Sequence, residues 1–115
     1  MTERRNEGRY LCADLVRVDW LAGEEDYRTE QGLLEDISEV GGCVQLDHPI
    51  PLGSTMMIRI GDAFFAGSVC YCVFRDYGYF VGMRFAEDTV WNKATAAPQH
   101  LTNLQDLALA YPAGH

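Results

Sequence analysis

Residues 55–85 read TMMIRIGDAFFAGSVCYCVFRDYGYFVGMRF, and this stretch decides the fold class. Gly61-Asp62 and the segment Arg75-Asp76-Tyr77-Gly78 divide it into apolar runs rich in aromatic and β-branched residues. Runs of this kind, separated by short turns that contain glycine, are typical of β-strands joined as hairpins. The stretch therefore predicts three strands, at residues 55–60, 63–74 and 79–85.

The residues that precede this stretch continue the same pattern. Between Tyr10 and Trp20 the apolar Val16, Val18 and Trp20 alternate with polar side chains, which predicts a half-buried strand. An acidic loop at residues 22–26 separates it from a second predicted strand at residues 27–37. A short strand is expected at residues 43–46, and the prolines that follow it at 49 and 51 predict a loop.

Six strands with a turn every 8–14 residues predict an all-β fold, a closed or nearly closed six-stranded antiparallel β-barrel. Closure also removes the exposed strand edges that such apolar strands would otherwise present. After Ala86 the pattern changes, and Glu87-Asp88 is a suitable start for a C-terminal α-helical tail. We therefore expect a flexible arginine-rich arm at residues 1–9, a barrel at 10–87 and a helical tail at 88–115.

Composition limits the classes of partner. The chain has 115 residues and a formal net charge of −8, which disfavours non-specific binding to DNA, RNA or anionic membranes. No apolar stretch is long enough for a secretory signal or a membrane span, so we expect a cytoplasmic protein without membrane insertion. The four cysteines and three histidines lack the spacing of a metal site, so no metal and no cofactor is expected.

The basic residues are unevenly distributed. Three arginines against Glu3 and Glu7 give residues 1–10 a net charge of +1, so the remaining residues sum to −9. A guanidinium offers a rigid pair of donors to phosphate oxygens, and its flat face stacks on a purine. Arg4, Arg5 and Arg9 therefore form a candidate phosphate grip, although such a segment taken alone is more often a solvated basic tail.

A second polar segment, residues 36–42, reads Asp-Ile-Ser-Glu-Val-Gly-Gly. The Asp36 carboxylate matches the two adjacent N–H donors of a guanine edge, and the Ser38 hydroxyl can donate or accept. Gly41 and Gly42 have no side chain, so a ligand ring can approach their backbone, and glycine also tolerates a positive φ in a turn. Taken alone, the segment is equally compatible with an ordinary hairpin connection, because Asp, Ser and Gly are common turn residues.

Together the two segments resemble the PilZ domain family. Its pattern is Arg-x-x-x-Arg followed by Asp/Asn-x-Ser-x-x-Gly, which Arg5 to Arg9 and Asp36 to Gly41 match at each fixed position. Residues 81–85 are similar to the Gly-hydrophobic-x-Phe strand that ends the family's barrel, and Tyr71 falls where many members carry tryptophan. The resemblance covers about residues 4–87 and leaves the tail beyond Pro98 uncovered.

The resemblance implies a bacterial receptor for the second messenger cyclic di-GMP. Arg5 and Arg9 would then hold phosphates and stack on guanines, Asp36 and Ser38 would read a guanine edge, and Gly41 with Gly42 would allow close approach. An arginine at the position of Arg4 implies capture of two intercalated ligand molecules. The free arm would be mobile, and cyclic di-GMP would fold it over the barrel mouth, which signals to an unidentified partner protein.

Two alternatives stay open. One is a ligand-independent PilZ-like protein-interaction module, because some members of that family lack the motifs and serve in assemblies. The other is an enzyme, which we do not expect, because the chain contains no Gly-rich phosphate loop, catalytic triad spacing or metal cluster.

Overall fold

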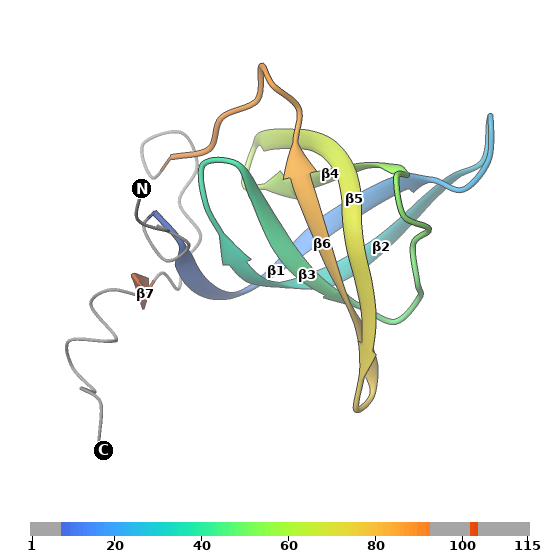
Figure 1. The fold of residues 1–115 in the computed structure, drawn as a ribbon, viewed down its shortest axis with the longest axis horizontal. Coiled ribbons are helices and arrows are strands. Elements are labelled where there is room, and N and C mark those ends of the chain that lie inside the picture. Colours follow the sequence, from blue (N-terminus) through green and yellow to red (C-terminus); the bar gives the residue numbers. More distant parts are fainter. Residues whose placement is uncertain (1–7, 93–101, 104–115) are drawn as a thin grey trace, which may run out of the picture.

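The structure is a computed structural model that describes residues 8–92 and 102–103. Its described residues form strands and loops and contain no helix. Figure 1 shows the long strands curled around one another. The strands are β1 (Tyr10–Leu21), β2 (Tyr27–Ile37), β3 (Gly41–Leu46), β4 (Thr55–Ile60), β5 (Ala63–Arg75), β6 (Gly78–Phe85) and a two-residue β7 (Thr102–Asn103).

The six long strands close into an antiparallel β-barrel. They follow the order β2-β3-β6-β5-β4-β1, and β1 also pairs with β2, so the sheet returns to its first strand. The β1–β2 hairpin continues beyond the barrel on one side, and the β5–β6 hairpin extends away from it in a different direction (Figure 1). These two hairpins and the β3–β4 loop define the parts of the surface that matter below.

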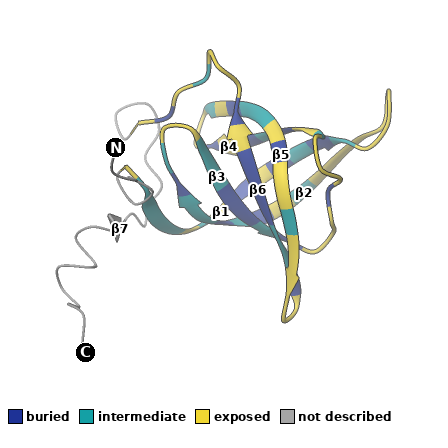
Figure 2. Ribbon diagram, in the orientation of Figure 1, coloured by how far each residue is buried: buried dark blue, intermediate teal, exposed yellow. Residues whose placement is uncertain are grey.

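The barrel encloses one apolar core. Inward-facing residues of all six strands contribute to it, and Val18, Leu34 and Ile58 are completely inaccessible to solvent. Figure 2 shows the buried positions alternating with more exposed ones along the strands, as the pleat requires. Among the described residues no polar or charged side chain is buried, so the core itself holds no polar site.

The structure confirms the predicted all-β class, the six-stranded barrel and the inward row of Val16, Val18 and Trp20. The predicted C-terminal helix does not begin at Glu87-Asp88, because a turn forms there, closed by Thr89 N–H donating to the Ala86 carbonyl at 2.8 Å. Most of the predicted helical tail lies outside the described residues. The short β7 was not predicted, and it pairs with the first two residues of β1.

Trp91 follows that turn and is buried at one end of the barrel. It is 1% exposed, and its ring packs edge-on against Tyr10, with the ring centroids 5.5 Å apart. Because Tyr10 begins β1, this contact ties the segment after β6 to the same barrel end at which β1 starts. The first residues of β1 are therefore held from two sides, by β2 and by Trp91.

Three irregularities in strand pairing occur at one level of the barrel. The register shifts between Leu11 and Asp14 in β1, between Leu34 and Asp36 in β2, and between Val69 and Tyr71 in β5. In β2 and β5 the bulge reverses the facing of the residues that follow it. Val69, before the bulge in β5, is therefore buried in the core, whereas Tyr71 and Val73, which follow it, are exposed.

Candidate functional site

The arm and the Asp36 segment meet at the start of the barrel. Arg9 Nη2 donates to Asp36 Oδ2 at 2.9 Å, although the two residues are 27 positions apart in the chain. Pairing of Leu11 with Asp36 in the β1–β2 ladder brings Arg9 to this place. The structure thus brings two of the predicted site residues, Arg9 and Asp36, into contact, whereas Arg4 and Arg5 lie outside the described residues.

Asp36 begins a row of side chains that runs across four strands. The pairing registers place Asp36 of β2 beside Cys43 of β3, then Gly82 of β6, then Tyr71 of β5. The row lies on the outer wall of the barrel, because Cys43 is not part of the core cluster and Tyr71 is 41% exposed. The Tyr71 ring covers Gly82, where an added Cβ would lie only 2.0 Å from a ring carbon.

A cavity of about 400 Å³ opens on this wall, and we call it the wall cavity. Its polar side is formed by Glu35 and Asp36, and its apolar floor by aromatic and aliphatic side chains of β5 and β6. The Arg75 guanidinium lies over the Phe80 ring, 5.7 Å from its centroid, and brings a positive charge to the far side. The lining residues are Leu11, Glu35, Asp36, Cys43, Tyr71, Val73, Arg75 and Phe80.

Burial sets the protonation behaviour of the wall cavity. It raises the pKa of Asp36 above the ordinary carboxyl value, and the Arg9 guanidinium only partly reverses this effect. Burial and the neighbouring Asp36 also raise the pKa of Glu35. Burial raises the pKa of the Cys43 thiol to about 11, so that cysteine is protonated and unreactive at neutral pH. The wall cavity thus presents carboxyl groups for which a hydrogen-bond donor or a cation is a favourable partner.

Ser38 lies in the turn between β2 and β3, where its own chain uses its polar groups. Ser38 N–H donates to the Gly41 carbonyl at 2.8 Å, and Val40 N–H donates to Ser38 Oγ at 3.3 Å. The hydroxyl itself is 3.4 Å from the Gly41 carbonyl oxygen. Ser38 therefore shapes the turn in this structure, and a ligand would have to compete with these contacts for its hydroxyl.

The glycines of the segment are required by the barrel itself. A Cβ on Gly41 would lie 2.2 Å from the Met83 carbonyl oxygen, and one on Gly42 would lie 3.0 Å from the Asp36 carbonyl oxygen. Neither glycine has a positive φ, so the expectation of a left-handed turn conformation there is wrong; the glycines with positive φ are Gly8, Gly53 and Gly61. Close approach of β6 to β3 is thus a reason for Gly41 that does not involve a ligand.

Several residues of the wall cavity were absent from the sequence prediction. Tyr71 was compared with a tryptophan of the family but was not assigned to the site. Cys43, Arg75 and Phe80 were not assigned to a site either. Bulges bring them together, and the apolar character of β5 gave no sign of where its register shifts. The cross-strand spacing of Cys43, Gly82 and Tyr71 becomes visible only once the order of the strands is known.

No protein family model matches this chain, and no curated protein is significantly similar to it. In the part of the chain that the structure describes, no three His, Cys, Asp or Glu side chains are grouped as metal ligands. That same part holds no helix of the length and apolar character needed to cross a membrane.

Proposed function

We propose that this protein is a receptor for cyclic di-GMP, as its resemblance to PilZ domains implies, and that it signals to a partner protein. The observation that carries the proposal is the 2.9 Å contact between Arg9 and Asp36. It joins the last residue of the Arg-x-x-x-Arg motif to the first residue of the Asp-x-Ser-x-x-Gly motif. Two motifs that are distant in sequence are thus close enough in space to contact the same ligand.

The wall cavity supplies surfaces suited to a nucleotide. Asp36 and Glu35 offer acceptors for the N–H groups of a guanine edge, while Tyr71, Val73 and Phe80 offer apolar contact to a base. Arg75 adds a cation over Phe80 that can attract a phosphate. In this proposal Arg5 and Arg9 hold phosphates and stack on guanines. Arg4 determines whether a second, intercalated ligand molecule binds.

The Arg9–Asp36 pair has a defined role in the proposed binding step. It holds the base of the arm against the wall in the free protein, and a partly buried pair of this kind, with Arg9 37% and Asp36 18% exposed, stabilises by about 1 kcal/mol. The cost of redirecting Arg9 toward a phosphate is therefore small compared with several charge-assisted hydrogen bonds. The ligand would lie on the outer wall beside Asp36, so it would order the arm along this wall rather than over the barrel mouth, as the sequence analysis expected.

Titration calorimetry with cyclic di-GMP tests the proposal. Arg5→Ala, Arg9→Ala and Asp36→Ala are each expected to lower affinity at least tenfold, and Arg4→Ala is expected to reduce the stoichiometry from two ligands to one. Arg17→Ala is the matched control, because Arg17 is an exposed arginine of β1 that does not line the wall cavity. Absence of heat at high micromolar ligand would overturn the proposal, as would equal affinity in all arginine variants.

We propose binding without turnover. Among the described residues the wall cavity brings together two carboxyl groups but no metal-ligand cluster and no activated nucleophile, because the Cys43 thiol is held protonated. Incubation of the protein with cyclic di-GMP should return the dinucleotide intact, as measured by chromatography. Release of linear dinucleotide that depends on Glu35 or Asp36 would instead indicate catalysis.

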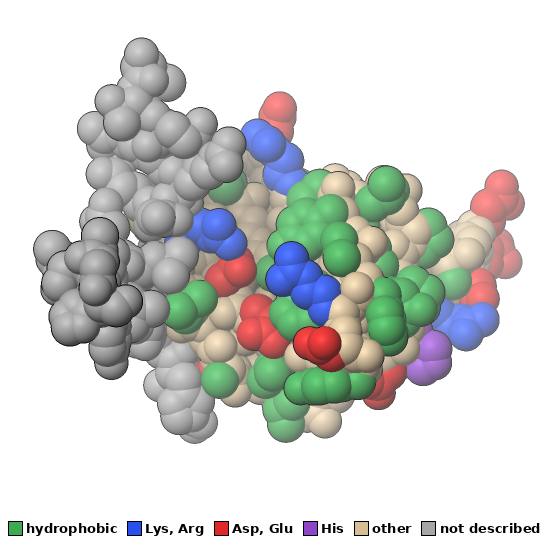
Figure 3. All heavy atoms as spheres, turned by 60° about the horizontal axis from the view of Figure 1, so that its bottom comes forward, with side chains coloured by type: hydrophobic (Ala, Val, Ile, Leu, Met, Phe, Trp, Pro, Cys, Tyr) green, Lys and Arg blue, Asp and Glu red, His purple; other side chains and the backbone are tan. Residues whose placement is uncertain are grey.

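A second candidate is the ligand-independent interaction module, and one observation favours it. The β5–β6 hairpin carries large exposed apolar side chains, with Tyr77 82% and Phe74 58% accessible. Hydrophobic side chains also gather on the face shown in Figure 3, between basic and acidic ones. Such patches often mark protein interfaces. Photo-crosslinking from position 77 to a partner, with a yield that is unchanged by cyclic di-GMP, would favour this candidate.

A further inference from the structure

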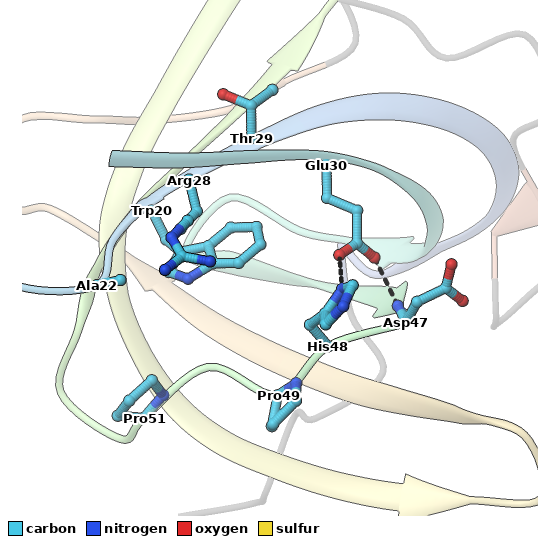
Figure 4. A pocket seen from close by; sticks show the side chains of 9 residues that line it. All are labelled: Trp20, Ala22, Arg28, Thr29, Glu30, Asp47, His48, Pro49 and Pro51. Carbon is cyan, nitrogen blue, oxygen red and sulfur yellow. Dashed lines mark hydrogen bonds and ion pairs between the residues drawn. The ribbon is translucent and has the colours of Figure 1, made fainter. Parts of the chain in front are cut away.

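A second cavity, of about 450 Å³, lies at a barrel end far from Arg9, and we call it the mouth cavity (Figure 4). It is formed where the β1–β2 hairpin faces the loop that connects β3 to β4. Trp20 is the last core residue of the inward-facing row of β1, and Arg28 and Glu30 continue the inward-facing row of Leu34 in β2 past the packed core. The lining residues are Trp20, Ala22, Arg28, Thr29, Glu30, Asp47, His48, Pro49 and Pro51.

The mouth cavity has an apolar interior. Trp20 is 7% exposed and lies on the barrel side, and Figure 4 shows Pro49 and Pro51 opposite it on the loop. Indole and proline rings form rigid surfaces that lose little conformational entropy when a ligand covers them. The cavity can therefore accept the hydrocarbon part of a side chain without reorganising its own walls.

The loop that forms the outer wall is fastened to β2 by one carboxylate. Glu30 Oε1 lies 2.6 Å from His48 Nδ1, and Glu30 Oε2 accepts the Asp47 backbone N–H at 2.5 Å (Figure 4). Both oxygens of Glu30 are thus engaged by the loop. Because the loop is held in place, the mouth cavity is formed before any ligand arrives, which lowers the entropic cost of binding.

The charges around the mouth cavity are predominantly negative. Arg28 is compensated by Asp26, whose carboxylate it contacts at 3.1 Å. The carboxylates of Glu24, Glu25 and Asp47 have no ion pair or hydrogen bond with any described residue. Glu30 and Asp47 line the cavity, and Glu24, Glu25 and Asp26 lie in the adjoining hairpin tip. These five carboxylates and Arg28 sum to a charge of −4 with His48 neutral. A ligand for this surface is therefore cationic.

We propose that the mouth cavity docks an arginine-bearing segment of a partner protein. The methylene stem of the arginine would pack between Trp20 and the two prolines, and its guanidinium would reach Asp47 and the carboxylates of the hairpin tip. Arginine fits this place better than lysine, because the guanidinium is weakly hydrated and stacks on flat apolar surfaces. The inference adds a protein-docking site that is separate from the wall cavity.

The two cavities are connected by a single strand. Asp36 belongs to the wall cavity and Glu30 to the mouth cavity, and both are residues of β2. The two residues are six positions apart along the strand, which corresponds to about 20 Å. The docking site is therefore far enough from the wall cavity for a partner and cyclic di-GMP to bind at the same time.

NMR titration of the full chain with a short peptide tests the docking site. The probe is acetyl-Gly-Arg-Gly-Arg-Gly-amide, and the matched control is the same peptide with glutamate in place of both arginines. The arginine peptide should shift the Trp20 indole N–H and the amides of residues 24–30 and 47–51, and leave residues 41–43 unchanged. The Trp20 signal is assigned by comparison with Trp91→Phe.

Two triple variants distinguish specific binding in the mouth cavity from general attraction of a cationic peptide to an acidic protein. The triple variant Glu24→Gln, Glu25→Gln, Asp47→Asn should weaken peptide binding at least tenfold. The triple variant Asp62→Asn, Glu87→Gln, Asp88→Asn removes the same charge from exposed turns elsewhere and should retain most of the affinity. Equal losses in both triples, shifts spread over the whole surface, equal binding of the glutamate peptide, or no shift at millimolar peptide would each overturn the inference. Any of these results leaves the calorimetric titration with cyclic di-GMP unaffected, because that titration is judged by the Arg9 and Asp36 variants of the wall cavity.

Discussion

The wall cavity and the mouth cavity share β2 but face opposite sides of it. At the mouth, Arg28 and Glu30 follow the inward rows of Gly32 and Leu34, as simple alternation requires. At the wall, Asp36 would also face inward by that alternation. The bulge between Leu34 and Asp36 prevents this: it turns Asp36 outward and gives the core position to Ile37, which is completely buried.

This contrast shows how one barrel obtains two chemically different sites. The mouth cavity is made by strands that extend past the core, so its residues keep the ordinary facing of their strands. The wall cavity depends on the bulges in β2 and β5, which turn Asp36, Tyr71 and Val73 outward at one level. Bulges are enriched beside functional sites because they redirect side chains without changing the strand order.

The largest effect is expected for Gly41→Ala, which tests the close packing behind the wall cavity. A methyl group at this position would lie 2.2 Å from the Met83 carbonyl oxygen, and backbone atoms on both strands would have to move. We expect a loss of about 3 kcal/mol in unfolding free energy, measured by urea denaturation.

Gly23→Ala, near the mouth cavity, is the matched control for this experiment. Its added Cβ meets only the Asp26 Cβ, at 3.8 Å, which is ordinary contact. Its stability should change by less than about 0.5 kcal/mol. If Gly41→Ala were as stable as the wild-type protein but failed to bind cyclic di-GMP, Gly41 would serve the ligand rather than the barrel.

The second prediction concerns the Tyr71 ring, which shields Cys43 and Gly82 on the outer wall of the barrel. Tyr71→Ala removes the ring that lies across Gly82 and borders Cys43. Because burial holds the Cys43 pKa at about 11, only about one thiol in a thousand is ionised at pH 8. Uncovering Cys43 removes part of the burial that raises its pKa and opens the thiol to the reagent, and both effects should outweigh the loss of the Tyr71 hydrogen bond, which lowers that pKa. The rate of alkylation by iodoacetamide should therefore rise at least tenfold, as followed by mass spectrometry.

Tyr27→Ala provides the comparison for that measurement, because Tyr27 is an exposed tyrosine at the opposite end of β2. It should leave the alkylation rate of Cys43 as it is in the wild-type protein. Cys70, which is exposed, serves as the internal reference in each sample. An unchanged Cys43 rate in Tyr71→Ala would show that β3 and β6 alone protect the thiol.

Much of this architecture could be predicted from the sequence, because it depends on alternation and on turn residues. The strands at 55–60 and 63–74 and the turn at Gly61 agree with the structure almost residue by residue. The joining of Arg9 and Asp36 came from a motif rather than from physical reasoning about the strands. The strands could be predicted because they depend on residues close together in sequence. The contact between Arg9 and Asp36 could be predicted because it depends on a known motif spacing.

The bulges could not be predicted, and most of the wall cavity depends on them. Nothing in the apolar run around Cys70 indicates which residue is the extra one, since valine, cysteine and tyrosine all suit either face. The burial of Trp91 against Tyr10 depends on the end of β6 returning to the start of β1, which is a property of the closed barrel. The mouth cavity was missed because its acidic hairpin and proline loop were each interpreted separately.

The third prediction concerns the charge of Asp36 as pH changes. Burial raises the pKa of Asp36 in the folded protein, so its contribution to stability is greatest in acid and is lost as pH rises through that pKa. Asp36→Asn cannot ionise, and its stability relative to the wild-type protein should therefore increase between pH 3 and pH 7. Urea denaturation at several pH values measures this difference.

The effect of Asp36→Asn should be larger when it is measured in the Arg9→Ala variant. Arg9 lowers the pKa of Asp36, so its removal should raise that pKa further and enlarge the gain that Asp36→Asn shows at pH 7. A wild-type protein that instead gains stability over Asp36→Asn as pH rises would show that the ion pair outweighs burial. In that case the wall cavity would hold a stable pair rather than a carboxylate that favours a new partner.

The smallest effect is expected at the mouth cavity, for Glu30→Gln. The substitution keeps the side-chain size but replaces a charged acceptor of the Asp47 N–H with a neutral one. Charge-assisted hydrogen bonds are stronger than neutral ones, so opening of the loop should become easier by about 1 kcal/mol. Hydrogen exchange at the Asp47 amide should then accelerate about fivefold.

Glu39→Gln, in the exposed turn beside the wall cavity, should leave exchange at the Asp47 amide unchanged. Global stability should change little in either variant, because His48 is largely exposed and its pair with Glu30 is weak. Unchanged exchange at Asp47 in Glu30→Gln would mean that the prolines alone hold the loop. The mouth cavity would then keep its shape without Glu30, and that carboxylate would be available to a cationic partner.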